Sequence, residues 1–199
     1  MTPQTTPEIH RSQTGKSHWI RGIKLPGWVR ELCVFILFLG LPVIFFPDMA
    51  LEGRFPTGGD ITLFTYPNFH FLSQQLHQGG FPFWNPYSFS GTPFFSDPQS
   101  AATHLPLLLS AAFIPANWGF PINLLIHFFM AGWFTYLFSR RLSLSRPASI
   151  LAGMCYMLGQ YSVTKVLVTS IFYSLPFLPL TLFAIERTIQ KRTIGSLII

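Results

Sequence analysis

The stretch LCVFILFLGLPVIFFP, residues 32–47, decides the fold, because none of its side chains carries a charge. Trp28 and Val29 extend the apolar character toward the N-terminus. Between them and the stretch lies Arg30, whose long side chain can reach the lipid headgroups. A helix needs roughly 17 to 25 apolar residues to cross a bilayer. The stretch therefore predicts a first transmembrane helix over residues 28–47.

Three further windows also lack Asp, Glu, Lys and Arg, at residues 98–139, 147–164 and 166–185. Of the 199 residues, 49% are apolar and only 10% are charged. A soluble domain carries about a quarter charged residues, because its surface faces water. The composition therefore predicts an all-α integral membrane protein with several spans.

The sequence does not favour a nucleic-acid-binding protein or an exported protein with a disulfide. The net charge of +6 does not indicate nucleic-acid binding, because the basic residues lie scattered beside apolar stretches without a cluster of stacking aromatics. Cys33 and Cys155 both fall inside predicted spans. We interpret them as small buried apolar residues rather than as an exported disulfide.

The basic residues predict the topology. Eleven of the thirteen form three groups, which the positive-inside rule places in the cytoplasm. One helix must carry the chain out after the first group, and an odd number of crossings must bring it back before the second. A crossing at residues 100–113 would break this parity, so we predict that this segment lies along the membrane. The groups are Arg11, Lys16, Arg21, Lys24 and Arg30; Arg140, Arg141 and Arg146; and Arg187, Lys191 and Arg192.

The predicted layout has four crossings and a cytoplasmic N-terminus. A Thr-, Ser-, Gln- and Pro-rich start predicts a disordered cytoplasmic tail, and a new apolar run at the other end suggests the N-terminal part of a longer protein. In order, we expect the tail at 1–27; spans at 28–47, 118–139, 147–162 and 170–186; an external loop at 48–117 with juxtamembrane helices near 61–77 and 98–113; and a further apolar segment from 193 to 199.

Function is expected in the external loop. Asp60 follows Gly58 and Gly59, and it places a carboxylate at the membrane surface among few other charges, where an ionisable group indicates chemistry. The glycines allow a sharp turn and a close approach of the backbone to a ligand. Asp60 fits equally well as a helix cap. Asp97 fits best as a cap, since Pro98 follows at the first helical position.

The order of motifs over residues 29–192 resembles the YfhO-like bacterial membrane proteins, which look like members of the GT-C superfamily of membrane glycosyltransferases. The resemblance implies a GT-C-like multi-pass bundle in the bacterial cytoplasmic membrane. It also implies transfer of a sugar from a polyprenyl-phosphate donor to an extracytoplasmic envelope acceptor, a cell-wall polymer or a lipid-linked glycan. The motifs are Gly58-Gly59-Asp60, Tyr66-Pro67, Pro82-x-Trp84-Asn85-Pro86, Gly91-x-Pro93, Pro98-Gln99-Ser100 and Leu105-Pro106.

The resemblance also implies a catalytic aspartate in the first external loop, and Asp60 matches it. We expect Asp60 to take the proton of the acceptor hydroxyl, with Gln99 and His104 orienting the sugar or phosphate. The other substrate-binding candidates are Gly59, Arg54 for the phosphate charge, and Trp84 and Asn85 of the aromatic segment. Trp84 fits an interface anchor as well as a sugar-stacking platform.

No cofactor is assigned, and a divalent metal stays an option although no metal ligand is identified. His70, His77 and His104 lack the four-residue spacing of a helical metal pair. Two departures from the family concern length and Asp97: the chain is short for the family, and Asp97 stands where Asn is expected. Two other functions stay open, a transporter or flippase of lipid-linked glycans and a non-catalytic envelope assembly factor.

Overall fold

The computed structural model describes residues 26–191, and this part of the chain is almost entirely helical. The apolar segment predicted at 193–199 lies outside the described residues, as does nearly all of the predicted tail at 1–27. The only strands in the described part are two residues long, β1 (Trp84–Asn85) and β2 (Thr92–Pro93), which pair antiparallel. An all-α protein is what the composition predicts.

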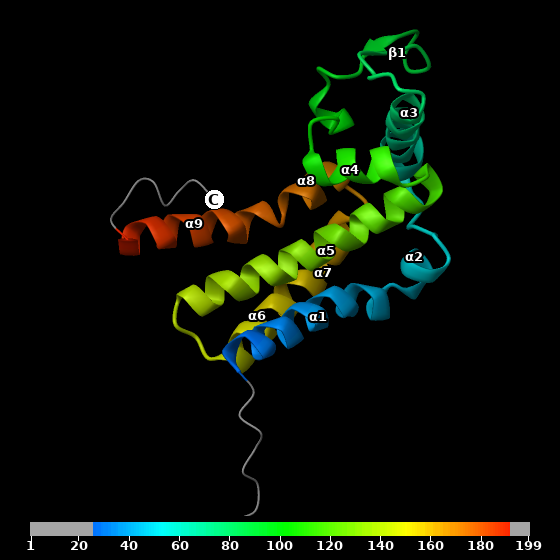
Figure 1. Ribbon diagram of the computed structural model, residues 1–199. Helices are drawn as coiled ribbons and strands as arrows, with labels where there is room; N and C mark the ends of the chain where they lie inside the picture. Colours follow the sequence, from blue (N-terminus) through cyan, green and yellow to red (C-terminus); the bar gives the residue numbers. More distant parts are fainter. Residues whose placement is uncertain (1–25, 192–199) are drawn as a thin grey trace, which may run out of the picture.

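Four helices form the bundle: α1 (Gly27–Phe45), α5 (Ala116–Arg141), α6 (Arg146–Leu158) and α9 (Phe177–Lys191). The long helix α5 contacts each of the other three, so it is the centre of the bundle (Figure 1). Two short helices, α7 (Gln160–Lys165) and α8 (Thr169–Ser174), connect α6 to α9.

Three segments of the described chain are long and apolar enough to cross a membrane: Gly27–Phe45, Ala116–Arg141 and Thr169–Gln190. The span predicted at 147–162 differs from this pattern. Helix α6 has only 13 residues, about 20 Å at 1.5 Å per residue, and it ends at Gly159, whose φ of −59° and ψ of 149° are not helical. The chain therefore breaks within this predicted span before α7 continues.

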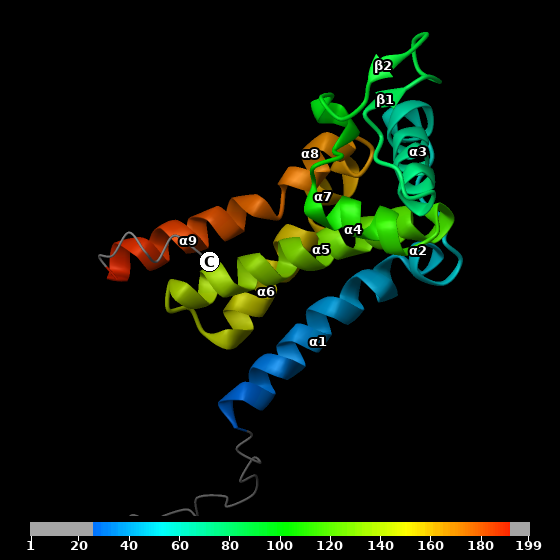
Figure 2. The same ribbon diagram turned by 45° about the horizontal axis from the view of Figure 1, so that its top comes forward.

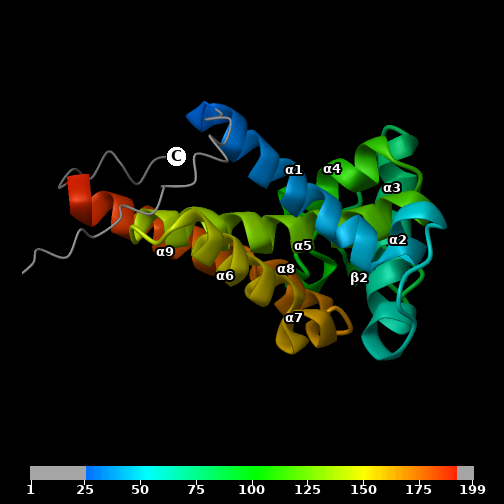
Figure 3. The same ribbon diagram turned by 90° about the horizontal axis from the view of Figure 1, so that it is seen from below.

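One end of the bundle carries an ion-pair network. Glu31, near the start of α1, accepts hydrogen bonds from Arg146 Nε at 2.9 Å and from the Tyr136 hydroxyl at 2.6 Å. The network joins α1 to the end of α5 and the start of α6. The start of α1 and the end of α9 lie toward one side of the molecule, and α2, α3 and the hairpin lie toward the other (Figure 3). The loop and the arginines of the α5–α6 turn thus occupy opposite ends.

Small residues let the helices approach one another. Phe38 of α1 is fully buried between α5 and α6. A Cβ on Gly132 would lie 2.7 Å from the Phe38 ring, and a Cβ on Gly153 would lie 2.5 Å from it and 2.7 Å from the carbonyl oxygen of Gly132. Close packing at small residues is a main source of helix association in membranes. The ring of Phe38 therefore requires glycine at both positions.

We expect Gly153→Ala to destabilise the bundle by about 1 to 3 kcal/mol, because the Phe38 ring and the α5 backbone must both shift. Gly40→Ala is the matched control, since nothing lies within 4 Å of a Cβ at that position of α1. Thermal unfolding in detergent measures both variants. An unchanged melting temperature for Gly153→Ala would contradict the packing described.

The loop between α1 and α5 folds into a small helical unit against one end of the bundle (Figure 2). It starts with α2 (Pro47–Leu51) and continues with the π-helical segment η1 (Ile61–Thr65), which leads directly into α3 (Tyr66–His77). After the hairpin come a single 3-10 turn η2 (Pro98–Ser100) and then α4 (Leu105–Phe113), which packs on α3 and α5.

The second loop helix begins at Leu105 rather than at the predicted Pro98. Ala101 adopts a left-handed φ of 51°, which ends the turn that Asp97 starts. Pro106 gives the physical reason, because a helix running from Pro98 would hold it in its interior, where proline lacks an N–H and clashes with the preceding turn. At nine residues, about 14 Å, α4 is too short to cross a bilayer core of about 30 Å.

The prediction that Cys33 and Cys155 are buried is wrong, since both are exposed on their helices. In a membrane bundle the outward face is apolar because it meets lipid, so an apolar residue in a span need not face the core. Hydrophobicity alone therefore does not distinguish the two faces of α1 or α6.

Candidate functional site

Asp60 stands at a tight turn in the loop between α1 and α5. Gly58 and Gly59 have φ values of 146° and 40°, which favour glycine, and the Gly58 N–H donates a hydrogen bond to Thr62 Oγ1 at 3.0 Å. Asp60 occupies the N-cap position of η1 but makes no side-chain capping hydrogen bond, and it is exposed. Its carboxylate is therefore not used as a cap and can meet a ligand.

A buried contact ties this segment to the end of the bundle. Thr65, the last residue of η1, shares a 2.8 Å hydrogen bond with the hydroxyl of Thr169 at the start of α8. Both threonines are buried. The helix that Asp60 begins is thus fixed against α8.

A cavity of about 350 Å³ opens where the loop meets α8 and α9, and we call it the His104 cavity. It brings together the predicted residues Gln99 and His104 with Thr169, which bonds to Thr65. Among the residues that the structure describes, no Asp, Glu, Lys or Arg lines it. The lining residues are Pro98, Gln99, Ala101, Thr103, His104, Thr169, Ser170, Tyr173, Ser174 and Phe177.

His104 is hydrogen-bonded to a second histidine that lies inside the bundle. Its Nε2 is 2.7 Å from Nε2 of His127, a fully buried residue of α5. His127 Nδ1 is in turn 2.7 Å from the backbone carbonyl oxygen of Asn123. Burial lowers the pKa of His104 below its ordinary value of 6.5, so its imidazole favours the neutral form.

Aromatic rings frame the histidine pair. Tyr173 stacks on His104 with ring centroids 5.4 Å apart and an angle of 15°, and Phe177 meets His104 edge-on at 5.6 Å. The Tyr173 hydroxyl is buried and has no hydrogen-bond partner among the described residues, and the same holds for the side-chain amide of Asn123. Buried polar atoms without a partner are rare and call for an explanation.

The remaining predicted residues lie elsewhere. Arg54 pairs with Glu52 at 2.8 Å and lines a separate cavity with Asp48 and Phe55. Trp84 is exposed and covers Gly91, where a Cβ would come within 2.6 Å of its ring.

Asn85 is buried and its amide serves the hairpin turn. The side-chain oxygen accepts a hydrogen bond from the Tyr87 N–H at 2.9 Å, and the side-chain nitrogen donates to the Ser88 hydroxyl at 3.2 Å. The Asn85 amide therefore stabilises the hairpin turn, and its contact with a substrate stays a prediction.

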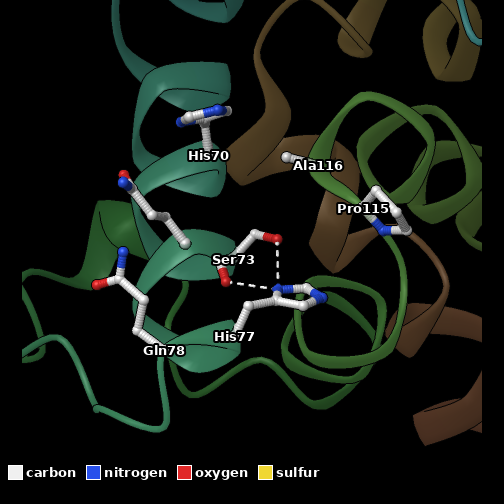
Figure 4. Close-up of a pocket in the computed structure, with 7 residues that line it drawn as sticks. His70, Ser73, His77, Gln78, Pro115 and Ala116 are labelled. Atoms are coloured by element: carbon white, nitrogen blue, oxygen red, sulfur yellow. Dashed lines mark hydrogen bonds between the residues drawn. The ribbon is translucent and has the colours of Figure 1, made fainter.

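Another cavity, of about 410 Å³, lies between α3 and the start of α5. Figure 4 shows His70 and His77 projecting from α3, with Pro115 and Ala116 across from them. His77 Nδ1 is 2.7 Å from the carbonyl oxygen of Ser73, so this nitrogen carries the proton. In the part of the chain that the structure describes, no three metal-binding side chains cluster here or elsewhere.

Sequence reasoning missed the pairing of His104 with His127. His127 is the one histidine within an otherwise uncharged span, and an ionisable residue there signals function. Its partner lies 23 positions earlier, across a helix and a turn, so no local spacing reveals the contact.

In the described residues, these features define an almost entirely helical protein with three helices long and apolar enough to span a membrane, and with a folded loop that lines a cavity at one end of the bundle. Comparison with protein-family models, with curated proteins and with solved structures gives no match.

We expect acid to destabilise the loop through His104. Because the pKa of His104 is lower in the folded state, the unfolded chain binds more protons below its ordinary value of 6.5. Stability from this group is therefore present above that pH and is lost as the pH falls. The melting temperature of His104→Gln should fall less between about pH 7 and about pH 5 than that of the wild type.

His70→Gln is the control, because His70 is an exposed imidazole of the same loop. It should keep the wild-type pH dependence. Identical pH profiles for His104→Gln and the wild type would show that His104 does not titrate differently in the folded protein.

Proposed function

We propose that this chain is a membrane glycosyltransferase, or its N-terminal part, that moves a sugar from a polyprenyl-phosphate donor to an acceptor outside the cytoplasm. The acceptor would be an envelope polymer or a lipid-linked glycan. The observation that carries the proposal is the free carboxylate of Asp60, on a helix fixed to the wall of the His104 cavity by the Thr65–Thr169 bond.

The position of this site supports a lipid-linked donor. The loop lies at the end of the bundle opposite the Glu31–Arg146 pair, and the positive-inside rule assigns the arginine end to the cytoplasm. On that assignment Asp60 and the cavity face outward at headgroup level, where a polyprenyl phosphate presents its sugar. The apolar outer faces of the helices then contact the polyprenyl tail.

The chemistry that we propose needs one base and one binding surface. Asp60 takes the proton of the acceptor hydroxyl as this oxygen attacks the anomeric carbon, and the lipid phosphate leaves. Gln99 and His104 hold the sugar. Arg54, which pairs with Glu52 and lines a separate cavity beside α2, is the loop residue that we propose to offer positive charge for the phosphate.

We expect Asp60→Asn to lower transfer from a polyprenyl-phosphate sugar by at least 100-fold in the full-length protein, because an amide cannot take the proton. The assay follows radiolabelled sugar moving from lipid to acceptor in proteoliposomes. Asp97→Asn is the matched control, since its oxygen accepts a hydrogen bond from the Gln99 N–H at 2.9 Å and asparagine caps equally well. Wild-type turnover by a folded Asp60→Asn protein would remove the proposed base.

A second candidate, a transporter of lipid-linked glycans, is favoured by one observation. His127 is an ionisable residue fully buried within a span, and such residues mark transport pathways. A transporter would move a fluorescent lipid-linked glycan across the membrane of proteoliposomes in the absence of any acceptor. His127→Phe would abolish this movement. A glycosyltransferase would leave the glycan on its original side.

A further inference from the structure

We propose that the His104 cavity binds an uncharged, hydroxyl-bearing sugar ring, and that His104 accepts a hydrogen bond from one of its hydroxyls through Nδ1. His127 fixes the imidazole of His104 in the tautomer that makes this possible. That this sugar is a substrate rests on the proposed function. That the cavity recognises sugar hydroxyls is argued from its own residues.

The tautomer follows from the chain of hydrogen bonds. The carbonyl oxygen of Asn123 can only accept, so the proton on His127 lies on Nδ1. A charged imidazole is costly in a buried position within a span, so His127 is neutral and its Nε2 is an acceptor. The 2.7 Å contact then requires His104 Nε2 to donate its proton to His127. Neutral His104 is left with an unprotonated Nδ1.

The two histidines therefore act in sequence. A hydrogen bond at one ring nitrogen of a histidine fixes whether the other nitrogen carries a proton. In this way Asn123 sets the tautomer of His127, and His127 sets the tautomer of His104. The free nitrogen of His104 belongs to a residue that lines the cavity. A hydroxyl donor satisfies it, whereas a phosphate dianion offers only oxygen acceptors.

The residues that line the cavity also favour a sugar over a phosphate group. A phosphate group is normally held by Arg or Lys, and within residues 26–191 no such residue lines the cavity. Instead the walls present the Gln99 amide and several hydroxyls, which both donate and accept. These partners suit the hydroxyls of a sugar. The hydroxyl-bearing residues are Thr103, Ser170, Thr169, whose hydroxyl already bonds to Thr65, and Ser174, whose hydroxyl donates to carbonyl oxygens of its own helix.

The aromatic wall gives independent support. Tyr173 and Phe177 line the cavity beside His104, and the apolar face of a sugar ring can pack against such rings. The Tyr173 hydroxyl is buried without a partner among the described residues. The volume of about 350 Å³ falls within the range of about 300 to 1,000 Å³ for small-molecule sites.

Nitrogen-15 NMR of the imidazoles, on the full chain in phospholipid nanodiscs free of sugar detergents, tests the inference. We expect the spectrum of the wild type to show His104 unprotonated at Nδ1 and protonated at Nε2. A panel of methyl hexosides should shift the Nδ1 resonance in a saturable way, and inorganic phosphate at the same concentration should not.

Variants separate the two parts of the claim. In His127→Phe the acceptor for His104 is lost, so we expect mixed tautomers at His104 and at least tenfold weaker hexoside binding. His70→Phe, the same change at an exposed imidazole of the loop, should leave both unchanged. If His127→Phe unfolds, the wild-type spectrum still decides.

The outcomes also separate this inference from the proposed function. A proton on Nδ1 of wild-type His104, or a shift with phosphate and none with any hexoside, would overturn the inference even if sugar transfer is observed. Saturable hexoside binding at His104 in a protein that transfers no sugar would support the inference and contradict the proposed enzyme.

Discussion

A 2.7 Å hydrogen bond between His104 and His127 joins the loop between α1 and α5 to the centre of the bundle. His127 belongs to α5, the helix that contacts α1, α6 and α9, and His104 directly precedes α4. The neighbouring rings of Tyr173 and Phe177 bring α8 and α9 to the same point. Together with the buried Thr65–Thr169 bond, this contact fixes the position of the loop more specifically than apolar packing would.

The charged residues of the loop and the His104 cavity lie in different places. In the described part of the chain, no charged residue lines the His104 cavity. The exposed carboxylate of Asp60 lies on a helix anchored to the cavity wall through Thr65 and Thr169. Our proposal uses these two features separately: the cavity would hold an uncharged sugar, and Asp60 would take the proton of a hydroxyl. Arg54 lies in a separate cavity, so the phosphate and the sugar would occupy different places.

The sequence predicted the helical class and the apolar helices, because hydropathy acts over whole segments. It missed features that depend on single backbone positions. Pro106 and Ala101 move the start of α4, and Gly159 breaks the third predicted span. Contacts between distant residues, such as Thr65 with Thr169, carry no local signal at all.

The central claim, that the loop with Asp60 and the His104 cavity faces away from the cytoplasm, is tested most directly by cysteine labelling in intact cells. In a chain with Cys33 and Cys155 replaced by alanine, single cysteines are placed at Ser90 in the hairpin and at Ser143 in the turn between α5 and α6. A membrane-impermeant maleimide should label residue 90 in intact spheroplasts and residue 143 only after permeabilisation. Labelling of residue 143 from outside, with residue 90 protected, would contradict the account.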